Sequence, residues 1–280
     1  MTKLSPALKE LINASFSRPG PAPAPAGIKD LYLKIAREAG ERKIGPRPWL
    51  AVSAAATITL NSPDSLSALY AVATGPRTPS RLDDVPAAEF IREVGLKCIS
   101  FNGIPRSINV LGAFRASLPD PVGSRLETRP SRGVDASNIG AVNARGRGLW
   151  DSVYTPFEAK LVDRLAHSHP DLPVHILGSH YGPLLSDPEG ERGGLERVGR
   201  VLTSVVAIAC LRAQGGVGPQ VLSHVFGLHK AVEQGFHERE AGVEGAEWLA
   251  GDEGSEWLLR KTDEVVEAIG GNFATREAKL

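Results

Sequence analysis

The sequence contains little cysteine, no long apolar run and no excess of charge of one sign. Two cysteines in 280 residues cannot form the disulfide framework of a small secreted domain. No uninterrupted run of about 18 apolar residues is present, so no membrane-spanning helix is expected. Lysine plus arginine and aspartate plus glutamate number 32 each, which gives no basic footprint for nucleic acid and no polybasic membrane patch.

Apolar residues recur at helical spacing along most of the chain. At 42% hydrophobic residues, the chain can bury a sizeable core. The stretch from Leu195 to Ala209 is apolar over so much of its surface that it predicts a central helix. Strand-like alternation does not compete with these patterns, so we predict an all-α fold. Further apolar stripes comprise Phe157, Leu161, Val162 and Leu165, and Trp248, Leu249, Trp257, Leu258, Val265, Val266 and Ile269.

Three proline-containing pairs have the composition of helix starts, with a capping side chain before proline. They are Ser5-Pro6, Ser62-Pro63 and Thr155-Pro156, the last with Glu158 in capping-box position. Residues 18–27, RPGPAPAPAG, predict an extended linker, so residues 1–27 should form a short helix and a linker before a fold that begins near Ile28. Residues 119–147 are rich in Pro, Gly, Ser and Arg and should separate two halves.

The two ends of the chain carry possible targeting information. The N-terminus lacks the apolar region of a secretory signal, and Glu10 with few arginines argues against a mitochondrial presequence, so a short surface helix is favoured there. Residues 238–280 are expected to form a helical tail with a break at Gly251 and Gly254. Its last residues, Ala278-Lys279-Leu280, match an import address of the Ser-Lys-Leu type. This address predicts binding to the peroxisomal import receptor and residence in the peroxisomal matrix.

The two halves contain a similar unit of helix, Gly/Pro turn and helix. Residues 91–114, IREVGLKCISFNGIPRSINVLGAF, align with residues 206–229, VAIACLRAQGGVGPQVLSHVFGLH, at a shift of 115. The shift pairs Gly103 with Gly218 and Gly112 with Gly227. In this register Asn109 occupies the place of His224.

These segments resemble a known family. Glu93, Gly103, Ile104 and Pro105 in the first half, and in the second half His169-Pro170-Asp171-Leu172, Tyr181-Gly182, the helix from Leu195, and His224 with Gly227, follow the order of the carboxymuconolactone decarboxylase and alkylhydroperoxidase D-like superfamily. With the C-terminal address, the chain resembles the fungal peroxisomal type. The resemblance implies an alkylhydroperoxidase D-like helical fold over residues 28–237, made of repeats at about 28–117 and 150–237, and it implies a homo-oligomer.

The peroxidase branch of this family uses a Cys-x-x-Cys pair four residues before its histidine. Counted back from His224, the two thiol places fall on Val217 and Gln220, so the pair is missing. Cys98 and Cys210 stand apart in apolar helical segments and are expected to be buried small hydrophobic residues. A hydroperoxide reductase is therefore the least favoured of the functions considered.

His224 is the catalytic candidate, because an imidazole about one turn after a Gly/Pro turn could act as a general acid or base. The alternative is a histidine that packs in a helix interface. Arg106 could clamp a carboxylate, although a structural pair with a neighbouring acid such as Glu93 is favoured. Gln220 and Asn109 complete the candidate substrate-binding set, with a surface amide and a helix cap as their ordinary roles.

No cofactor or metal is expected. The chain has no Walker loop or Rossmann fingerprint, and His175 and His180 are five residues apart, which is poor spacing for two ligands on one helical face. The favoured function is cofactor-independent acid–base chemistry on a small carboxylated or carbonyl metabolite. The rival is a binding or assembly protein of the same fold that has lost the chemistry, as the missing thiols suggest.

Overall fold

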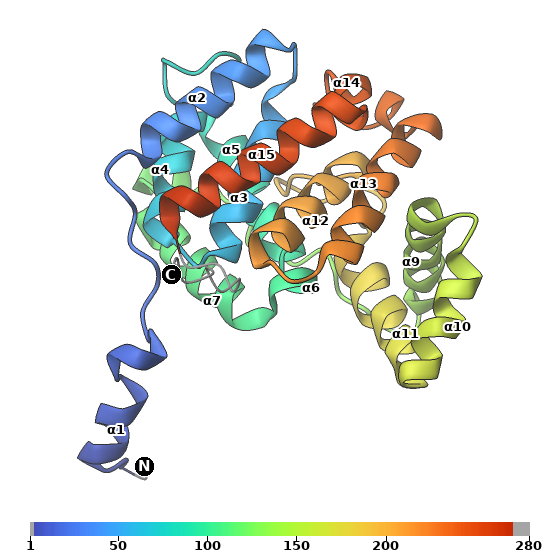
Figure 1. Cartoon of the computed structure of the whole chain (residues 1–280), viewed down its shortest axis with the longest axis horizontal. Helices are drawn as coiled ribbons and strands as arrows, with labels where there is room; N and C mark the ends of the chain where they lie inside the picture. The colour runs from blue at the N-terminus through green and yellow to red at the C-terminus, as the bar shows by residue number, and fades with distance from the viewer. Residues whose placement is uncertain (1–2, 271–280) are drawn as a thin grey trace, which may run out of the picture.

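The computed structural model describes residues 3–270, and these residues contain helices and no strand, which confirms the predicted all-α class (Figure 1). Within this part of the chain, no helix combines the length and the apolar character needed to cross a bilayer. The α-helices are α1 Pro6–Ile12, α2 Ile28–Glu41, α3 Pro46–Thr59, α4 Pro63–Ala73, α5 Asp84–Lys97, α6 Ile99–Asn102, α7 Ile104–Ser117, α8 Asp120–Gly123, α9 Ile139–Tyr154, α10 Glu158–Ser168, α11 Asp171–His175, α12 Arg200–Gln214, α13 Gly218–Glu233, α14 Ala246–Ala250 and α15 Asp252–Ile269. A π-helix, Ile176–Leu185, follows α11, and short 3-10 turns lie at Ser15–Ser17 and Phe236–Glu238.

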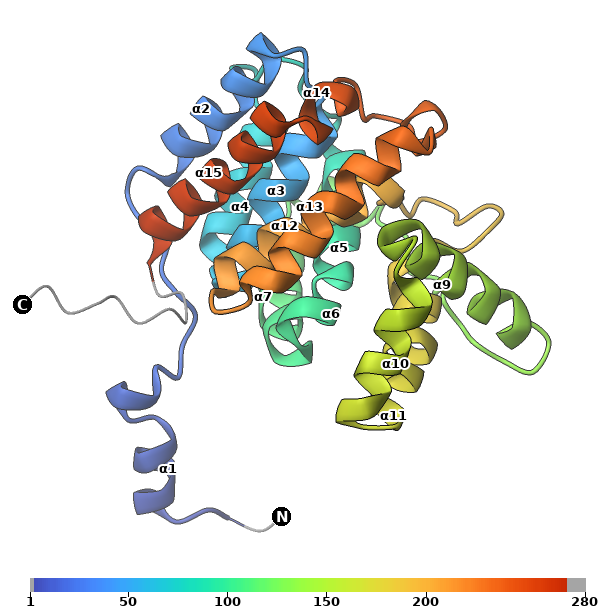
Figure 2. The same cartoon turned by 45° about the vertical axis from the view of Figure 1, so that its right-hand side comes forward.

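The core is built around α3 and α12, which are buried along almost their whole length. Helix α15 packs against both and against α2, as the two views of the ribbon show (Figures 1 and 2). Its Trp257, Leu258 and Val265 are part of the core. Up to Ile269, the region expected as a C-terminal tail is therefore packed into the helical body. The predicted break occurs at Gly251, between α14 and α15, whereas Gly254 lies inside α15.

Two of the three predicted helices start at the expected proline, but only the first has the predicted side-chain cap. The Ser5 hydroxyl accepts a hydrogen bond from the Leu8 backbone N–H at 3.2 Å and caps α1. Helix α4 begins at Pro63, but the Ser62 hydroxyl donates to the Ala22 carbonyl at 2.9 Å instead of capping the helix. Ser62 thereby attaches the Pro/Ala linker to the helical body.

The third predicted helix start is wrong. The Thr155–Pro156 peptide bond is cis, and α10 begins only at Glu158. The capping box of Thr155 with Glu158 is not formed, because Phe157, not Thr155, is the residue that precedes the helix.

Two further boundaries differ from expectation. Helix α9 begins at Ile139 and occupies about the last third of the segment expected as a connection, where its glycines weaken the helical signal. Helix α12 begins at Arg200 rather than at Leu195. The reason is a carboxylate from a distant part of the chain: Glu240 accepts hydrogen bonds from the N–H groups of Val201 at 2.7 Å and Leu202 at 3.0 Å, which fixes the first turn there.

Both halves contain a helix, a glycine turn and a second helix, but the register differs from the one expected. The second helices, α7 and α13, each have proline at their second position, Pro105 and Pro219, which are 114 residues apart. Their buried faces agree with that shift, since Val110 and His224 are both buried. His224 therefore corresponds to Val110, and the pairing of His224 with Asn109 is wrong.

Helices α9, α10 and α11 form an arm beside the helical body (Figures 1 and 2). The arm is closed by a backbone contact between α9 and the π-helix. A β-carbon added at Gly146 would lie 2.5 Å from the Cα and N atoms of Gly182, closer than real β-carbons come to backbone. Glycine at position 146 is what permits this crossing.

Candidate functional site

His224 lies on the buried face of α13, one turn and a half into the helix, with 7% of its surface exposed. Its ring contacts two aromatic rings edge to face: Phe101 of α6 at 5.8 Å and Tyr154 of α9 at 6.2 Å between centroids. The Nδ1 atom is buried and has no hydrogen-bond partner among residues 3–270. His224 thus joins the helical body to the arm through its ring faces and retains one unused polar atom.

Burial, followed by the positive charge of Arg200, lowers the pKa of His224 to about 4. A neutral imidazole is therefore the dominant form at pH 7. The neutral ring can accept a proton only when its surroundings change, for example when the charge of Arg200 is compensated.

Three aromatic residues line the arm next to His224. The Trp150 ring lies 4.2 Å from that of Tyr154 and 5.0 Å from that of Tyr181. The Tyr181 hydroxyl donates to the Tyr154 hydroxyl at 3.2 Å, and burial raises the pKa of both phenols. Trp150 donates from Nε1 to the Glu158 carbonyl at 3.2 Å. These contacts hold α9, α10 and the π-helix together, and the raised pKa values leave both phenols protonated at neutral pH.

Arg200, the first residue of α12, has its side chain buried between the arm and the body. Its guanidinium donates to the Ser152 hydroxyl at 2.7 Å, the Ser204 hydroxyl at 2.6 Å and the Gly227 carbonyl at 2.7 Å. All of these acceptors are neutral, and no carboxylate of residues 3–270 lies within ion-pair distance. Burial lowers the pKa of Arg200 to about 10, so the group remains charged at neutral pH. A buried arginine normally has an anionic partner.

A cavity of about 390 Å³ opens beside Arg200. Arg145 also lines it, and the Nε of this side chain is buried with no partner in the described part of the chain. Phe236 closes one side, with the Arg200 guanidinium 5.8 Å from its ring centroid. The cavity thus combines two guanidinium groups with apolar walls. The complete lining is Arg145, Gly148, Leu149, Ser152, Leu185, Ser186, Asp187, Gly199, Arg200, Thr203 and Phe236.

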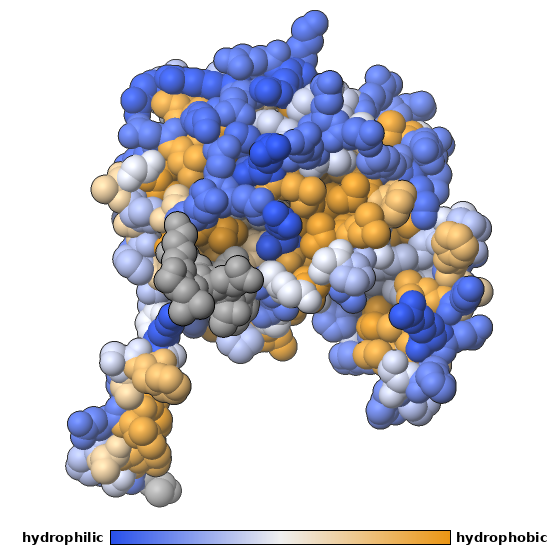
Figure 3. Space-filling model, viewed as in Figure 1, coloured by the Kyte–Doolittle hydropathy of each residue, from blue (hydrophilic) through white to orange (hydrophobic). Residues whose placement is uncertain are grey.

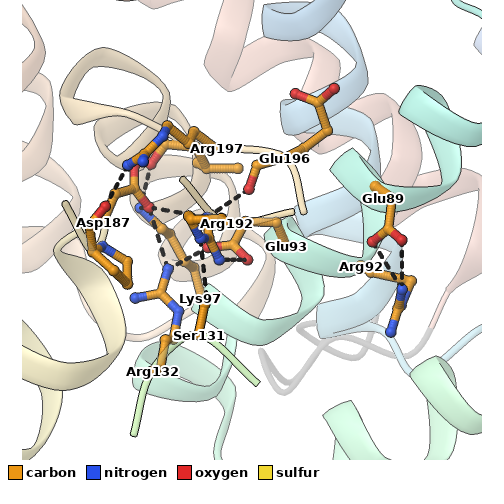
Figure 4. A network of polar contacts seen from close by, with 12 residues as sticks. Glu89, Arg92, Glu93, Lys97, Ser131, Arg132, Asp187, Arg192, Glu196 and Arg197 are labelled. Carbon is orange, nitrogen blue, oxygen red and sulfur yellow. Dashed lines mark hydrogen bonds and ion pairs between the residues drawn. The ribbon is translucent and has the colours of Figure 1, made fainter. Parts of the chain in front are cut away.

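The one carboxylate in this lining, Asp187, belongs to a buried ion-pair network (Figure 4). Asp187 accepts from Lys97 at 3.1 Å and from Arg132 at 3.2 Å. Glu93 accepts from Arg132 and, at 2.9 Å, from Arg192. Because Asp187 is already paired within this network, it does not compensate the two arginines of the cavity.

Opposing effects set the charge state of this network. Burial raises the pKa of Glu93, but Arg132, Arg192 and Lys97 outweigh it, and the pKa lies below its ordinary value. Burial lowers the pKa of Lys97, an effect that Asp187 and Glu93 oppose. The network joins α5 to the connection before α9 and to the segment that follows the π-helix.

The other predicted binding residues do not line this cavity. Gln220 and Asn109 are exposed. Arg106 donates to the Thr59 carbonyl at 2.6 Å, at the end of α3. Glu93 is not the partner of Arg106, because it pairs with Arg132 and Arg192. Sequence reasoning missed Arg145 and Arg200, since neither lies in a motif and their neighbours come from distant segments.

The two cysteines are buried as expected, but they do not stand apart. The Sγ atoms of Cys98 and Cys210 are 3.5 Å from each other. A signal for this contact is present in the sequence: each cysteine stands five residues before a glycine of positive φ that ends its helix, Gly103 and Gly215. An alignment of the two halves with a single shift of 115 residues does not pair the two cysteines, because the turn in the second half is two residues longer than the turn in the first.

The histidines of the arm form a small group of their own. The rings of His175 and His180 are 5.3 Å apart, edge to face. His180 shares a hydrogen bond of 3.1 Å with Ser100 of α6. Within residues 3–270, no three His, Cys, Asp or Glu side chains are placed to hold a metal ion together.

A relative of this chain is Peroxisomal protein 2 of Saccharomyces cerevisiae. The two are 30% identical over 155 residues, which cover 49% of this chain and 52% of the yeast protein. The chain thus spans about half the length of this relative. No protein-family model matches the chain, and no solved structure matches it.

Proposed function

We propose that this chain is a peroxisomal protein that binds a small carboxylated metabolite between Arg145 and Arg200. The observation that carries the proposal is the buried guanidinium of Arg200, which has only neutral acceptors. Removing a charge from water is costly unless an opposite charge is supplied, and a carboxylate ligand would supply it. Arginine also matches a carboxylate through two parallel hydrogen bonds.

The walls of the cavity restrict the ligand further. Its volume of about 390 Å³ is at the small end of the range for metabolite sites. Leu149, Leu185 and Phe236 favour an apolar body behind the acid group, and Ser186 and Thr203 can orient a further oxygen. A small monocarboxylate or dicarboxylate with an apolar or carbonyl-bearing body fits these walls.

Substitution of Arg145 tests the binding proposal. Arg145→Gln is expected to weaken binding of a small carboxylate by roughly 10- to 100-fold, because charge-assisted hydrogen bonds contribute about 1.5–3 kcal/mol. Binding is measured by calorimetry with the best ligand from a panel of small carboxylic acids, and neutral amides of the same acids serve as ligand controls. Arg145 is preferred to Arg200 because it leaves the contacts of Arg200 with Ser152, Ser204 and Gly227 intact.

Arg147→Gln is the matched control. This side chain lies on the same helix, two residues further on, and forms an exposed ion pair with Asp151 at 2.7 Å. It should leave the affinity unchanged. Equal affinities of the wild type and Arg145→Gln, or binding of the neutral amides as tight as that of the acids, would contradict the proposal.

A second candidate function is an enzyme of the carboxymuconolactone-decarboxylase type, with His224 as the acid–base group. The observation in its favour is the unpartnered Nδ1 of His224 beside Arg200. A carboxylate bound to Arg200 would offset the charge that lowers the pKa of His224 and move this pKa toward neutrality. Ligand binding would then prepare the histidine to accept a proton from the bound molecule.

The compartment is inferred from two sources. The yeast relative is named a peroxisomal protein. The tripeptide Ala278-Lys279-Leu280 has the form of a peroxisomal import address, although it lies outside the residues that the structure describes. The proposed partner is therefore the import receptor, bound through the free C-terminus.

Removal of Leu280 tests the proposed address. A fluorescent protein fused before Met1 should accumulate in peroxisomes with the full chain and remain cytosolic without Leu280, because the receptor binds the free terminus and the leucine side chain together. Peroxisomal import that persists without Leu280, or a mitochondrial signal with the full chain, would contradict it.

We also propose that the chain self-associates. Apolar side chains are exposed one turn apart on α13, with Leu222 at 57% and Phe226 at 55%, and others are exposed on the arm, such as Val174. Figure 3 shows apolar surface over the α12–α13 region and over the arm. Contiguous apolar surface of this kind favours a protein interface.

A further inference from the structure

The contact between Cys98 and Cys210 joins the two halves of the chain. Cys98 stands at the junction of α5 and α6, and Cys210 lies about one turn before the end of α12. Both side chains are completely buried, and the Cys210 thiol donates to the sulfur of Cys98 at 3.5 Å. A disulfide bond is about 2.0 Å long, so the sulfurs must approach by only about 1.5 Å to bond.

We infer that Cys98 and Cys210 are a redox-active pair, which a hydroperoxide converts into a disulfide that links the two halves of the fold. This modification goes beyond metabolite binding and uses none of the residues of the Arg200 cavity. It is a single oxidation of the protein rather than a catalytic turnover.

The surroundings of the pair assign an order to the two thiols. The amide Nδ2 of Asn102, in the α6 turn, donates to the Cys210 sulfur at 3.7 Å, so Cys210 is the sulfur reached first when this turn opens. Burial and the neighbouring Cys210 raise the pKa of the Cys98 thiol well above its ordinary value. Cys210 is therefore the attacking sulfur, and Cys98 resolves the intermediate.

The chemistry is balanced by the hydroperoxide alone. The Cys210 thiolate attacks the outer peroxide oxygen, the O–O bond breaks, and the alkoxide or hydroxide leaves with a proton, which gives a sulfenic acid on Cys210. Cys98 loses its proton and attacks the Cys210 sulfur, and the sulfenic oxygen leaves as water. The two thiols together lose two hydrogen atoms, which is two protons and two electrons. The hydroperoxide takes them up and is reduced to one molecule of alcohol and one of water, or to two molecules of water when it is hydrogen peroxide.

Access to the pair is controlled by α6. This helix is a single turn, contains no fully buried residue, and ends at the exposed Gly103. Its residues contact the pair through Asn102, the His224 ring through Phe101, and His180 through Ser100. Opening of this turn exposes Cys98 and Cys210 without unfolding α12, so oxidation should be slow but possible in the native protein.

The experiment treats the reduced, full-length protein with hydrogen peroxide under native conditions and follows its intact mass. The expected product has lost two hydrogen atoms, contains no free thiol, and regains both thiols with dithiothreitol. Because the chain has only two cysteines, this product identifies the disulfide without peptide mapping. Closing so long a loop should raise the melting temperature by roughly 5–10 °C, and a reductant should reverse the rise.

The variants Cys98→Ala and Cys210→Ala are the controls, and neither should show the loss of two hydrogen atoms or the rise in melting temperature. The wild-type mass remains decisive if a variant does not fold. Two results would overturn the inference: a covalent dimer as the main product, or thiols that stay reduced in the native protein but oxidise in urea.

Discussion

Replacing Glu93 with glutamine is expected to lower the free energy of unfolding by about 3–5 kcal/mol, because removal of one partner leaves buried charges uncompensated. Glu93 is 4% exposed and pairs with Arg132 and Arg192. Urea unfolding at pH 7 measures the loss. Since the pKa of Glu93 is lower in the folded chain than its usual 4.5, its stabilising contribution is present above that pH and is lost on acidification through the folded pKa.

The matched control for Glu93→Gln is an exposed ion pair. Asp263 and Arg212 bond at 2.7 Å, but their side chains are 40% and 47% exposed. Asp263→Asn is therefore expected to cost less than about 1 kcal/mol. A loss in Glu93→Gln no larger than in Asp263→Asn would show that the network of Figure 4 does not depend on the charge of Glu93.

His224 is expected to make the protein less stable in mild acid. The pKa of His224 is about 4 in the folded chain, whereas the ordinary value is 6.5. Between these values the unfolded chain binds a proton that the folded chain does not, so stability falls as the pH decreases from about 6.5 toward 4. From pH 7.5 to pH 5 this one group should remove about 2 kcal/mol of unfolding free energy.

His224→Gln should abolish this part of the pH dependence, measured as the difference between unfolding free energies at the two pH values. The control His167→Gln removes an exposed histidine of α10 and should retain the wild-type difference. An unchanged pH dependence in His224→Gln would show that folding does not lower the pKa of His224, and it would remove the motive for an acid–base role.

The all-α class could be predicted from the sequence, because the apolar spacing along α3, α12 and α15 can be read within each segment alone. It was insufficient where a distant group fixes a boundary. Glu240 sets the start of α12 from beyond α13, and no pattern within residues 195–205 indicates it. Helix α9 was missed because glycine lowers local helix propensity while serving a contact with another segment.

For the candidate site, sequence reasoning proposed His224 but not the groups around it. In the sequence, Arg145 and Arg200 look like ordinary surface arginines. They become unusual only in the folded chain, where they are buried without an anionic partner. The cysteine pair was missed for a related reason, since proximity in space depends on how the two units pack. Asn109 was selected through a register that was one residue from the structural one, so its comparison with His224 could not hold.

The crossing of α9 over the π-helix predicts a sequence pattern by which remote relatives can be found. The backbones touch at Gly146 and Gly182, so a side chain at Gly146 would force the helices apart. A larger residue at position 146 would collide with the backbone at Gly182. Two glycines separated by about 36 residues, with aromatic residues after the first and before the second, can therefore be recognised after most other identities have been lost.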